Sequence, residues 1–210
     1  MLAVLGCLSS GEGAPTTVRE PGQALHAHLA DSLAALDLEA VRSAVRIADL
    51  GAGAGFPGLP LAIALPASQV RLVESHRRKC AFIERVCQTA AIDDARVVWT
   101  RAEEWAEGME ANDIVLARAV APPPVVLEYS APLLRVGGML VDWRGRRNAE
   151  EEAAATAAAA ELGLQLDSIC SKQPYPGVRA HHLHTYLKVA PTPARFPRRA
   201  GVARKRPLGC

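Results

Sequence analysis

One stretch of the chain, residues 47–66, constrains the fold more than any other: "IADLGAGAGFPGLPLAIALP". An apolar segment runs directly into three closely spaced glycines, Gly51, Gly53 and Gly55, and then into a second apolar segment with the character of a helix. Glycines at such a point permit positive φ angles and a close approach of the backbone to a ligand. The stretch therefore predicts a buried strand, a ligand-binding turn and a helix, which together begin an α/β sheet.

Strands and helices alternate along the rest of the chain. We expect strands at residues 46–50, 70–75, 95–100, 113–119, 139–143, 164–173 and 181–190, and helices at residues 23–36, 59–66, 78–92, 124–134 and 150–164. The glycines of "RVGG" should end the fourth helix, and Trp99 and Trp143 should pack within their strands. Only the turn-rich residues 174–179 join the last two strands, so these two should pair antiparallel. The expected fold is an open α/β sheet with an antiparallel final strand.

The glycine loop alone leaves three interpretations open. Gly53-x-Gly55-x-x-Gly58 also has the spacing of a dinucleotide-binding loop, so the ligand could be a nicotinamide dinucleotide, S-adenosylmethionine or nothing. Glu74 ends the next expected strand, where a carboxylate can accept hydrogen bonds from both ribose hydroxyls of an adenosine. Both cofactors contain an adenosine, so Glu74 favours a ligand without separating the two.

Asp49 and Pro57 favour S-adenosylmethionine. A carboxylate at Asp49 can meet the amino group of a methionine, whereas it would repel the pyrophosphate of a dinucleotide. Pro57 removes a backbone donor from the turn that would face the phosphates. The antiparallel final strand also suits a methyltransferase sheet better than a dinucleotide-binding one.

Length and composition predict one domain with two extensions. At 210 residues the chain is short for two domains, and we expect a short N-terminal extension at 1–22, a methyltransferase domain at 23–190 and a basic C-terminal tail at 191–210. The five cysteines lack zinc or C-x-x-C spacing, and the first residues lack the basic start of a signal peptide. We therefore expect a cytoplasmic monomer that does not bind membranes. His181, His182 and His184 lack an evident further ligand, so no metal is expected.

Several segments together resemble one family. The segments "DLGAGAGFPGLPLAIALP", "VRLVESHRRKCAFIERV", "TRAEEW", "DIVLARAVAP", "LLRVGGMLVDWRGRR" and "FPRRAGVARKRPL" resemble the GidB/RsmG family, the ribosomal RNA small subunit methyltransferase G or glucose-inhibited division protein B family. The resemblance runs from about residue 17 to residue 208. It implies a class I, Rossmann-like methyltransferase fold and transfer of a methyl group from S-adenosylmethionine to N7 of one guanine in 16S ribosomal RNA.

The resemblance also implies roles for individual residues. Gly51 and Phe56 should contact the cofactor together with Gly53 and Gly55, and Ala102 and Glu103 should lie beside the adenine. Arg118 should contact the cofactor near the site of transfer, and Asp49 and Glu74 complete the expected cofactor set. The residues His28, Asp31 and Ser32 match a family motif that precedes the first strand. Arg144 stands where a lysine is more usual.

Clusters of basic residues predict a nucleic-acid partner, which the resemblance implies to be 16S ribosomal RNA or the small ribosomal subunit. The expected RNA-binding residues follow the fifth parallel strand or lie in the tail: Arg144, Arg146, Arg147, Arg198, Arg199 and Lys205. The segment "RAVAPPP" after the fourth strand lacks a side chain that could accept the protons of an exocyclic amine. Since N7 of guanine carries a free lone pair, we expect catalysis by positioning, without a general base. Two other functions stay open: an NAD(P)-dependent oxidoreductase, and a non-catalytic RNA-binding protein of methyltransferase fold.

Overall fold

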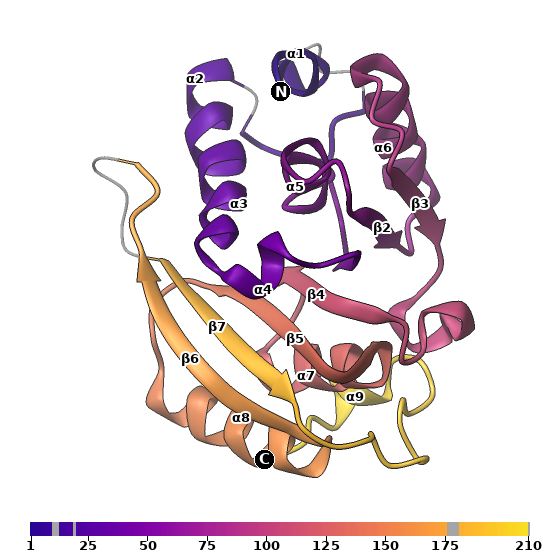
Figure 1. The fold of residues 1–210 in the computed structure, drawn as a ribbon, viewed down its shortest axis with the longest axis vertical. Helices are drawn as coiled ribbons and strands as arrows, with labels where there is room; N and C mark the ends of the chain where they lie inside the picture. The colour runs from indigo at the N-terminus through magenta and orange to yellow at the C-terminus, as the bar shows by residue number, and fades with distance from the viewer. Residues whose placement is uncertain (10–12, 19, 176–180, 210) are drawn as a thin grey trace.

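The computed structural model describes residues 1–9, 13–18, 20–175 and 181–209 (Figure 1). Seven strands of this part of the chain form one sheet in the order β3-β2-β1-β4-β5-β7-β6. Their bounds are β1 Arg46–Leu50, β2 Gln69–Glu74, β3 Ala95–Trp99, β4 Asn112–Arg118, β5 Leu134–Arg144, β6 Leu164–Lys172 and β7 His181–Lys188. The first five strands are parallel, and β7 is antiparallel to both β5 and β6. The expected α/β sheet with an antiparallel final strand is thus confirmed, while most of the turn expected at 174–179 lies outside the described residues.

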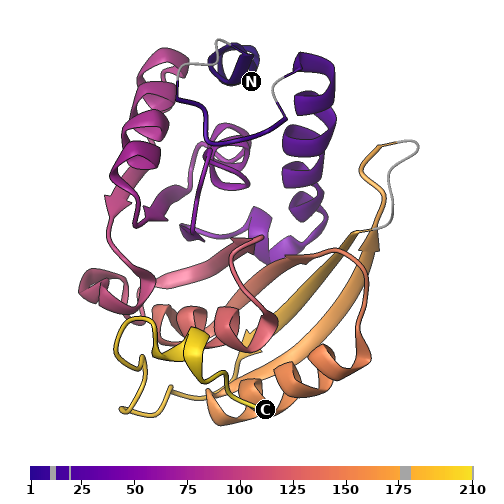
Figure 2. The same ribbon diagram turned by 180° about the vertical axis from the view of Figure 1, so that it is seen from behind.

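The helices form two layers, one on each face of the sheet (Figures 1 and 2). One layer holds α1 Leu2–Ser9, α2 Pro21–Ala24, α3 Asp31–Leu33, α4 Glu39–Arg42, α5 Gly58–Ala64 and α6 Arg77–Ala90. The other holds α7 Pro123–Ser130, α8 Ala149–Glu161 and α9 Val202–Lys205. Alternate residues of a strand point to opposite faces. Ile47 of β1 accordingly joins the core under α5 and α6, while its neighbour Ala48 joins the core under α7 and α8.

Two expected elements differ from the structure. The helix expected at 23–36 is divided into α2, a π-helical stretch Leu25–Ala30, α3 and a 3-10 turn Ala34–Asp37. The glycines of "RVGG" do not end a helix but lie inside β5, which begins at Leu134. A Cβ at Gly138 would lie only 2.9 Å from the carbonyl oxygen of Asp113, so glycine lets β5 approach β4 closely at this point.

The strand order reverses between β1 and β4, which lie side by side. From β1 the chain proceeds to β2 and β3 on one side, and from β4 it proceeds to β5 on the other. In open α/β sheets, ligands bind beyond the carboxyl ends of the strands at such a point. Gly51 directly follows β1, and Arg118 ends β4, so the fold brings the glycine loop and this arginine to the expected ligand crevice.

Candidate active site

The glycine loop has a backbone that other residues would not adopt readily. The φ angles are +62° at Gly51, +61° at Gly53 and +91° at Gly55. A Cβ on Gly51 would lie 3.2 Å from Cγ2 of Val120, and one on Gly55 would overlap the side chain of Leu59. Glycine is therefore needed both for the conformation of the loop and for the space around it.

Asp49 lies beneath this loop with its side chain fully buried. Oδ2 accepts a hydrogen bond from the backbone N–H of Gly58 at 2.8 Å, and Oδ1 has no partner among the described residues. Burial raises the pKa of Asp49 to about 7, against the opposing effects of the Gly58 N–H and of Arg118. A buried carboxylate oxygen without a donor suits a site that a bound amino group would complete.

Glu74, the last residue of β2, is hydrogen-bonded to the glycine loop. Oε2 accepts from the N–H of Gly53 at 3.1 Å, and Oε1 accepts from the backbone N–H of His76 at 2.8 Å. Burial alone would raise the pKa of Glu74, but the hydrogen bonds from His76, the charge of Lys79 and the Gly53 N–H lower it. The carboxylate is therefore ionised and fixed in position, as an acceptor for ribose hydroxyls must be.

Two cavities open beside the loop and share the residue Val120. The narrow one, of about 100 Å³, includes Gly51, Ser75, Ala102, Glu103, Val120, Tyr129 and Arg204 in its lining. Ala102 and Glu103 belong to a 3-10 turn, Ala102–Glu104, that follows β3. Three expected cofactor residues, Gly51, Ala102 and Glu103, thus surround one cavity, although they come from two separate loops.

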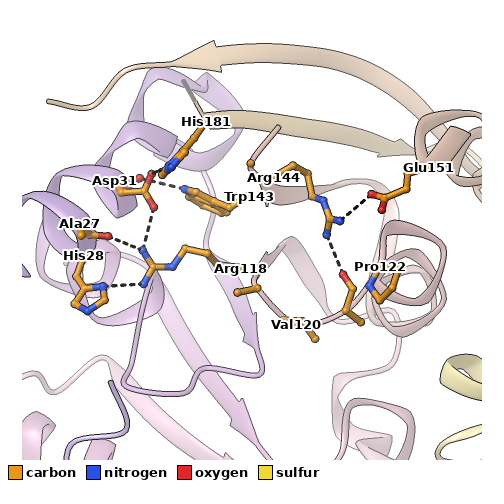
Figure 3. A pocket seen from close by; sticks show the side chains of 13 residues that line it. Ala27, His28, Asp31, Arg118, Val120, Pro122, Trp143, Arg144, Glu151 and His181 are labelled. Atoms are coloured by element: carbon orange, nitrogen blue, oxygen red, sulfur yellow. Dashed lines mark hydrogen bonds and ion pairs between the residues drawn. The ribbon is translucent and has the colours of Figure 1, made fainter. Parts of the chain in front are cut away.

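The wide cavity has a volume of about 650 Å³ and lies next to Arg118 (Figure 3). Nη1 of Arg118 donates to Oδ2 of Asp31 at 3.0 Å and to the carbonyl oxygen of Ala27 at 3.2 Å. The other oxygen of Asp31 is 3.1 Å from Nδ1 of His181, and the Trp143 indole N–H donates to the Asp31 carbonyl. Asp31 thereby connects the helical layer that contains α3 to β4, β5 and β7.

Phe56 contacts two residues that line the wide cavity, His28 and Arg118. Its ring stacks on the imidazole of His28 with the ring centroids 4.7 Å apart, and the Arg118 guanidinium carbon lies 5.7 Å from the Phe56 centroid. Burial, followed by the charge of Arg118, lowers the pKa of His28, so this imidazole is neutral at neutral pH. Of the expected cofactor residues, Arg118 lines the wide cavity, whereas five others line neither of these two cavities: Asp49, Gly53, Gly55, Phe56 and Glu74.

Arg144 closes the wide cavity on the side of α8 (Figure 3). Nη1 donates to the carbonyl oxygen of Ala121 at 2.9 Å, and Nη2 lies 3.5 Å from Oε2 of Glu151. Asp142, 3.6 Å from the Arg144 guanidinium, is buried, and burial raises its pKa to about 7 although Arg144 opposes the rise.

The other expected RNA-binding residues are divided between exposed and paired positions. Arg146, Arg199 and Lys205 are exposed. Arg147 forms an ion pair with Glu152, whose carboxylate oxygen lies 2.6 Å from Nη2. Nε of Arg198 donates to Oε1 of the buried Glu128 at 2.7 Å, which gives Arg198 a structural partner.

The sequence did not reveal two residues of the site and misjudged one nearby. His181 was considered only as a candidate metal ligand and rejected, and Arg204 was not among the expected cofactor-binding or RNA-binding residues. The contact of His181 with Asp31 spans 150 positions, and no local spacing marks it. Trp99 does not pack within the sheet as expected, because β3 is an edge strand: its side chain is 61% exposed, with its indole N–H bonded to the Ser75 carbonyl.

Among the described residues, no group of three or more histidine, cysteine or acidic side chains is placed to hold a metal ion. No helix in this part of the chain is long and apolar enough to cross a membrane. Cys80, Cys87 and Cys170 are not joined in disulfides, and Cys210 lies outside the described residues.

Solved structures of methyltransferases share the fold of this chain. A predicted O-methyltransferase from Agrobacterium tumefaciens is 25% identical with a TM-score of 0.58, and the match covers 77% of this chain and 80% of that one. An S-adenosylmethionine-dependent O-methyltransferase from Thermotoga maritima has a TM-score of 0.58 at 18% identity, over 78% of this chain and 66% of that one. The fold is therefore that of the class I methyltransferases.

Comparison of sequences identifies the family. The ribosomal RNA small subunit methyltransferase G of Chloroflexus aggregans is 40% identical over 196 residues, which cover 92% of this chain and 82% of the relative. The protein of the same name from Desulfitobacterium hafniense is 38% identical, over 92% of this chain and 81% of its own length. The GidB family profile, described as rRNA small subunit methyltransferase G, matches residues 15–178. The chain thus belongs to the GidB family of rRNA small subunit methyltransferases.

Proposed function

We propose that this protein transfers a methyl group from S-adenosylmethionine to N7 of one guanine in 16S ribosomal RNA, as a cytoplasmic monomer. The observation that carries the proposal is the arrangement at the strand-order reversal. There the glycine loop and Arg118 border two cavities that meet at Val120. One cavity is lined by the residues expected around an adenosine, and the other has the volume that small-ligand sites usually have.

The cofactor would be held by the glycine loop and the two loops beside it. Gly51 provides the space, Ala102 and Glu103 border the adenine, and Glu74 accepts hydrogen bonds from the ribose. Oδ1 of Asp49 has a free acceptor position for the methionine amino group. When bound, S-adenosylmethionine supplies an electrophilic methyl group.

The acceptor base would enter the wide cavity beside Arg118 and Trp143. A base within folded RNA must leave its stack to reach such a pocket. The N7 lone pair of guanine is free at neutral pH, so no residue has to remove a proton before transfer. The protein's task is then to hold the base in line for the reaction, and positioning of this kind contributes about 7–11 kcal/mol.

The Arg118–Asp31–His181 network supports this positioning role. Each oxygen of the Asp31 carboxylate is bound to a different partner, so the guanidinium of Arg118 has a fixed orientation at the edge of the cavity. The exposed cations Arg146, Arg199 and Lys205 would attract the RNA phosphates. The role we propose for Arg198 is to anchor the tail through Glu128.

A melting experiment separates this function from that of an oxidoreductase. We expect S-adenosylmethionine to raise the melting temperature, since a ligand that binds only the native state stabilises it. NAD should leave the melting temperature unchanged. Protection by NAD alone would reject the methyltransferase assignment, and methyl transfer to ribosomal RNA would distinguish an enzyme from an RNA-binding protein without activity.

A further inference from the structure

The loop Ala119–Pro122 separates the two cavities and has a strained backbone. Ala119 has a φ of +56°, a conformation that residues other than glycine rarely adopt. Val120 lines both cavities, and its side chain lies over the Cα of Gly51. Strained backbone of this kind persists only where surrounding contacts hold it in place.

Two arginines from distant parts of the chain provide such contacts. Arg144 donates to the carbonyl oxygen of Ala121, and Nη2 of Arg204 donates to the carbonyl oxygen of Val120 at 2.9 Å. Arg204 and Tyr129 both line the narrow cavity, where the Arg204 side chain opposes the rise that burial causes in the pKa of Tyr129. Arg204 therefore joins the separating loop to the lining of the expected adenosine pocket.

The tail that carries Arg204 is firmly attached to the same region. The Gly201 N–H donates to Oε1 of Glu103 at 3.1 Å, and Phe196 is buried. The Arg198 guanidinium binds both oxygens of the buried Glu128 and the Arg206 carbonyl. In both ribbon views α9 lies beside α7 (Figures 1 and 2).

We propose that Arg204 is a positioning residue of the cofactor site, through which the C-terminal tail holds the loop Ala119–Pro122 against the glycine loop. The inference rests on the proposed use of S-adenosylmethionine. It assigns the tail a part in cofactor binding in addition to its expected contact with RNA. Without Arg204, the strained loop relaxes away from Gly51 and the adenosine pocket loses one wall.

Calorimetric titration of the full chain with S-adenosylmethionine, in the absence of RNA, tests the proposal. We expect Arg204→Ala to raise the Kd at least about fivefold, as loss of a charged hydrogen bond does. Arg204→Lys should recover part of the affinity, because an ammonium group can bind the Val120 carbonyl but lacks the planar, multiply donating guanidinium. Melting temperatures of the free proteins should be alike, since Arg204 is exposed.

Arg206→Ala is the matched control, since it removes the same guanidinium charge from an exposed residue just after α9 and keeps the Arg206 carbonyl that Arg198 binds. Its Kd should equal that of the wild type. Equal affinities in all variants would overturn the proposal, and so would an equal loss in Arg204→Ala and Arg206→Ala, which would indicate a general charge effect. A wild-type protein that does not bind S-adenosylmethionine would instead reject the proposed function itself.

Discussion

At the scale of single residues, Gly51 matters for two reasons. A side chain at this position would disfavour the conformation of the loop, and it would also fill the space that the ligand needs. Gly51→Val should abolish binding of S-adenosylmethionine, because a branched residue disfavours φ of +62° and its Cβ would press on Val120. Calorimetry measures the effect. Gly6→Ala is the control, since a Cβ there meets no atom within 4 Å. Unchanged affinity in Gly51→Val would contradict the assigned position of the cofactor.

Asp49 has a different character, because its buried carboxylate opposes folding in the absence of a ligand. The pKa of about 7 in the native state exceeds the ordinary value of 3.8. The native state therefore binds more protons between pH 4 and 7, and the free energy of unfolding falls as the pH rises through this window.

Asp49→Asn should remove this pH-dependent loss of stability. Relative to wild type, the variant's free energy of unfolding should increase between pH 5 and pH 8, by on the order of 2 kcal/mol. Urea unfolding at the two pH values measures the difference. Asp142, whose pKa is also raised, is present in both proteins and therefore does not contribute to it.

For Asp113 the pKa shift has the opposite sign, because hydrogen bonds from Arg135 and from backbone N–H groups outweigh its burial and lower its pKa. Asp113→Asn is thus a control whose free energy of unfolding, relative to that of the wild type, should fall as the pH rises from 2 to 5. A pH-independent difference for Asp49→Asn would contradict the assigned pKa.

At the scale of elements, the ion pair between Arg198 and the buried Glu128 helps to attach the tail. Arg198→Ala should destabilise the protein by about 3 kcal/mol, because it leaves the buried carboxylate of Glu128 without its partner. Arg195→Ala is the matched control: the Arg195 side chain is 63% exposed and pairs with Glu161, so its loss should cost at most about 1 kcal/mol. Denaturant unfolding measures both. Equal effects would show that the tail does not depend on the Arg198–Glu128 contact.

Local sequence patterns predicted most of the elements. The strand expected at 46–50 coincides with β1, and the helix expected at 78–92 differs from α6 by one or two residues at each end. Both segments have a clear pattern of apolar residues, and residues that interrupt this pattern mark their ends. The early start of β5 had no such signal, because the need for glycine at Gly138 comes from the neighbouring strand β4. The break in the helix expected at 23–36 was also missed, and Leu25, where the π-helical stretch begins, is 45% exposed.

The candidate site was predictable only where its residues follow directly from a strand. Gly51 and Glu74 each stand at the end of a strand, so the α/β pattern alone places them at one edge. The pairing of Arg118 with Asp31 spans 87 positions, and the contact of Arg204 with Val120 spans 84. Such contacts depend on how the layers and the tail pack, which no local pattern encodes.

At the scale of the whole molecule, charge should govern the encounter with RNA. Replacing Arg146, Arg199 and Lys205 by alanine should weaken binding to small-subunit ribosomal RNA and reduce the salt slope of log K by about 2 to 3, roughly one for each lost phosphate contact. The control replaces Arg46, Arg71 and Arg96, which lie near the amino ends of β1, β2 and β3. Filter binding over a range of salt concentrations measures both. If the two triple variants behave alike, the carboxyl edge of the sheet does not bind the RNA.

Methyl transfer is the reaction that we would measure first. The purified protein is incubated with labelled S-adenosylmethionine and small-subunit ribosomal RNA that lacks the modification, free and within the subunit, and the labelled nucleoside is identified. We expect a single product, N7-methylguanosine. A protein that binds S-adenosylmethionine but labels neither form of the RNA, or labels another atom, would contradict the proposed function.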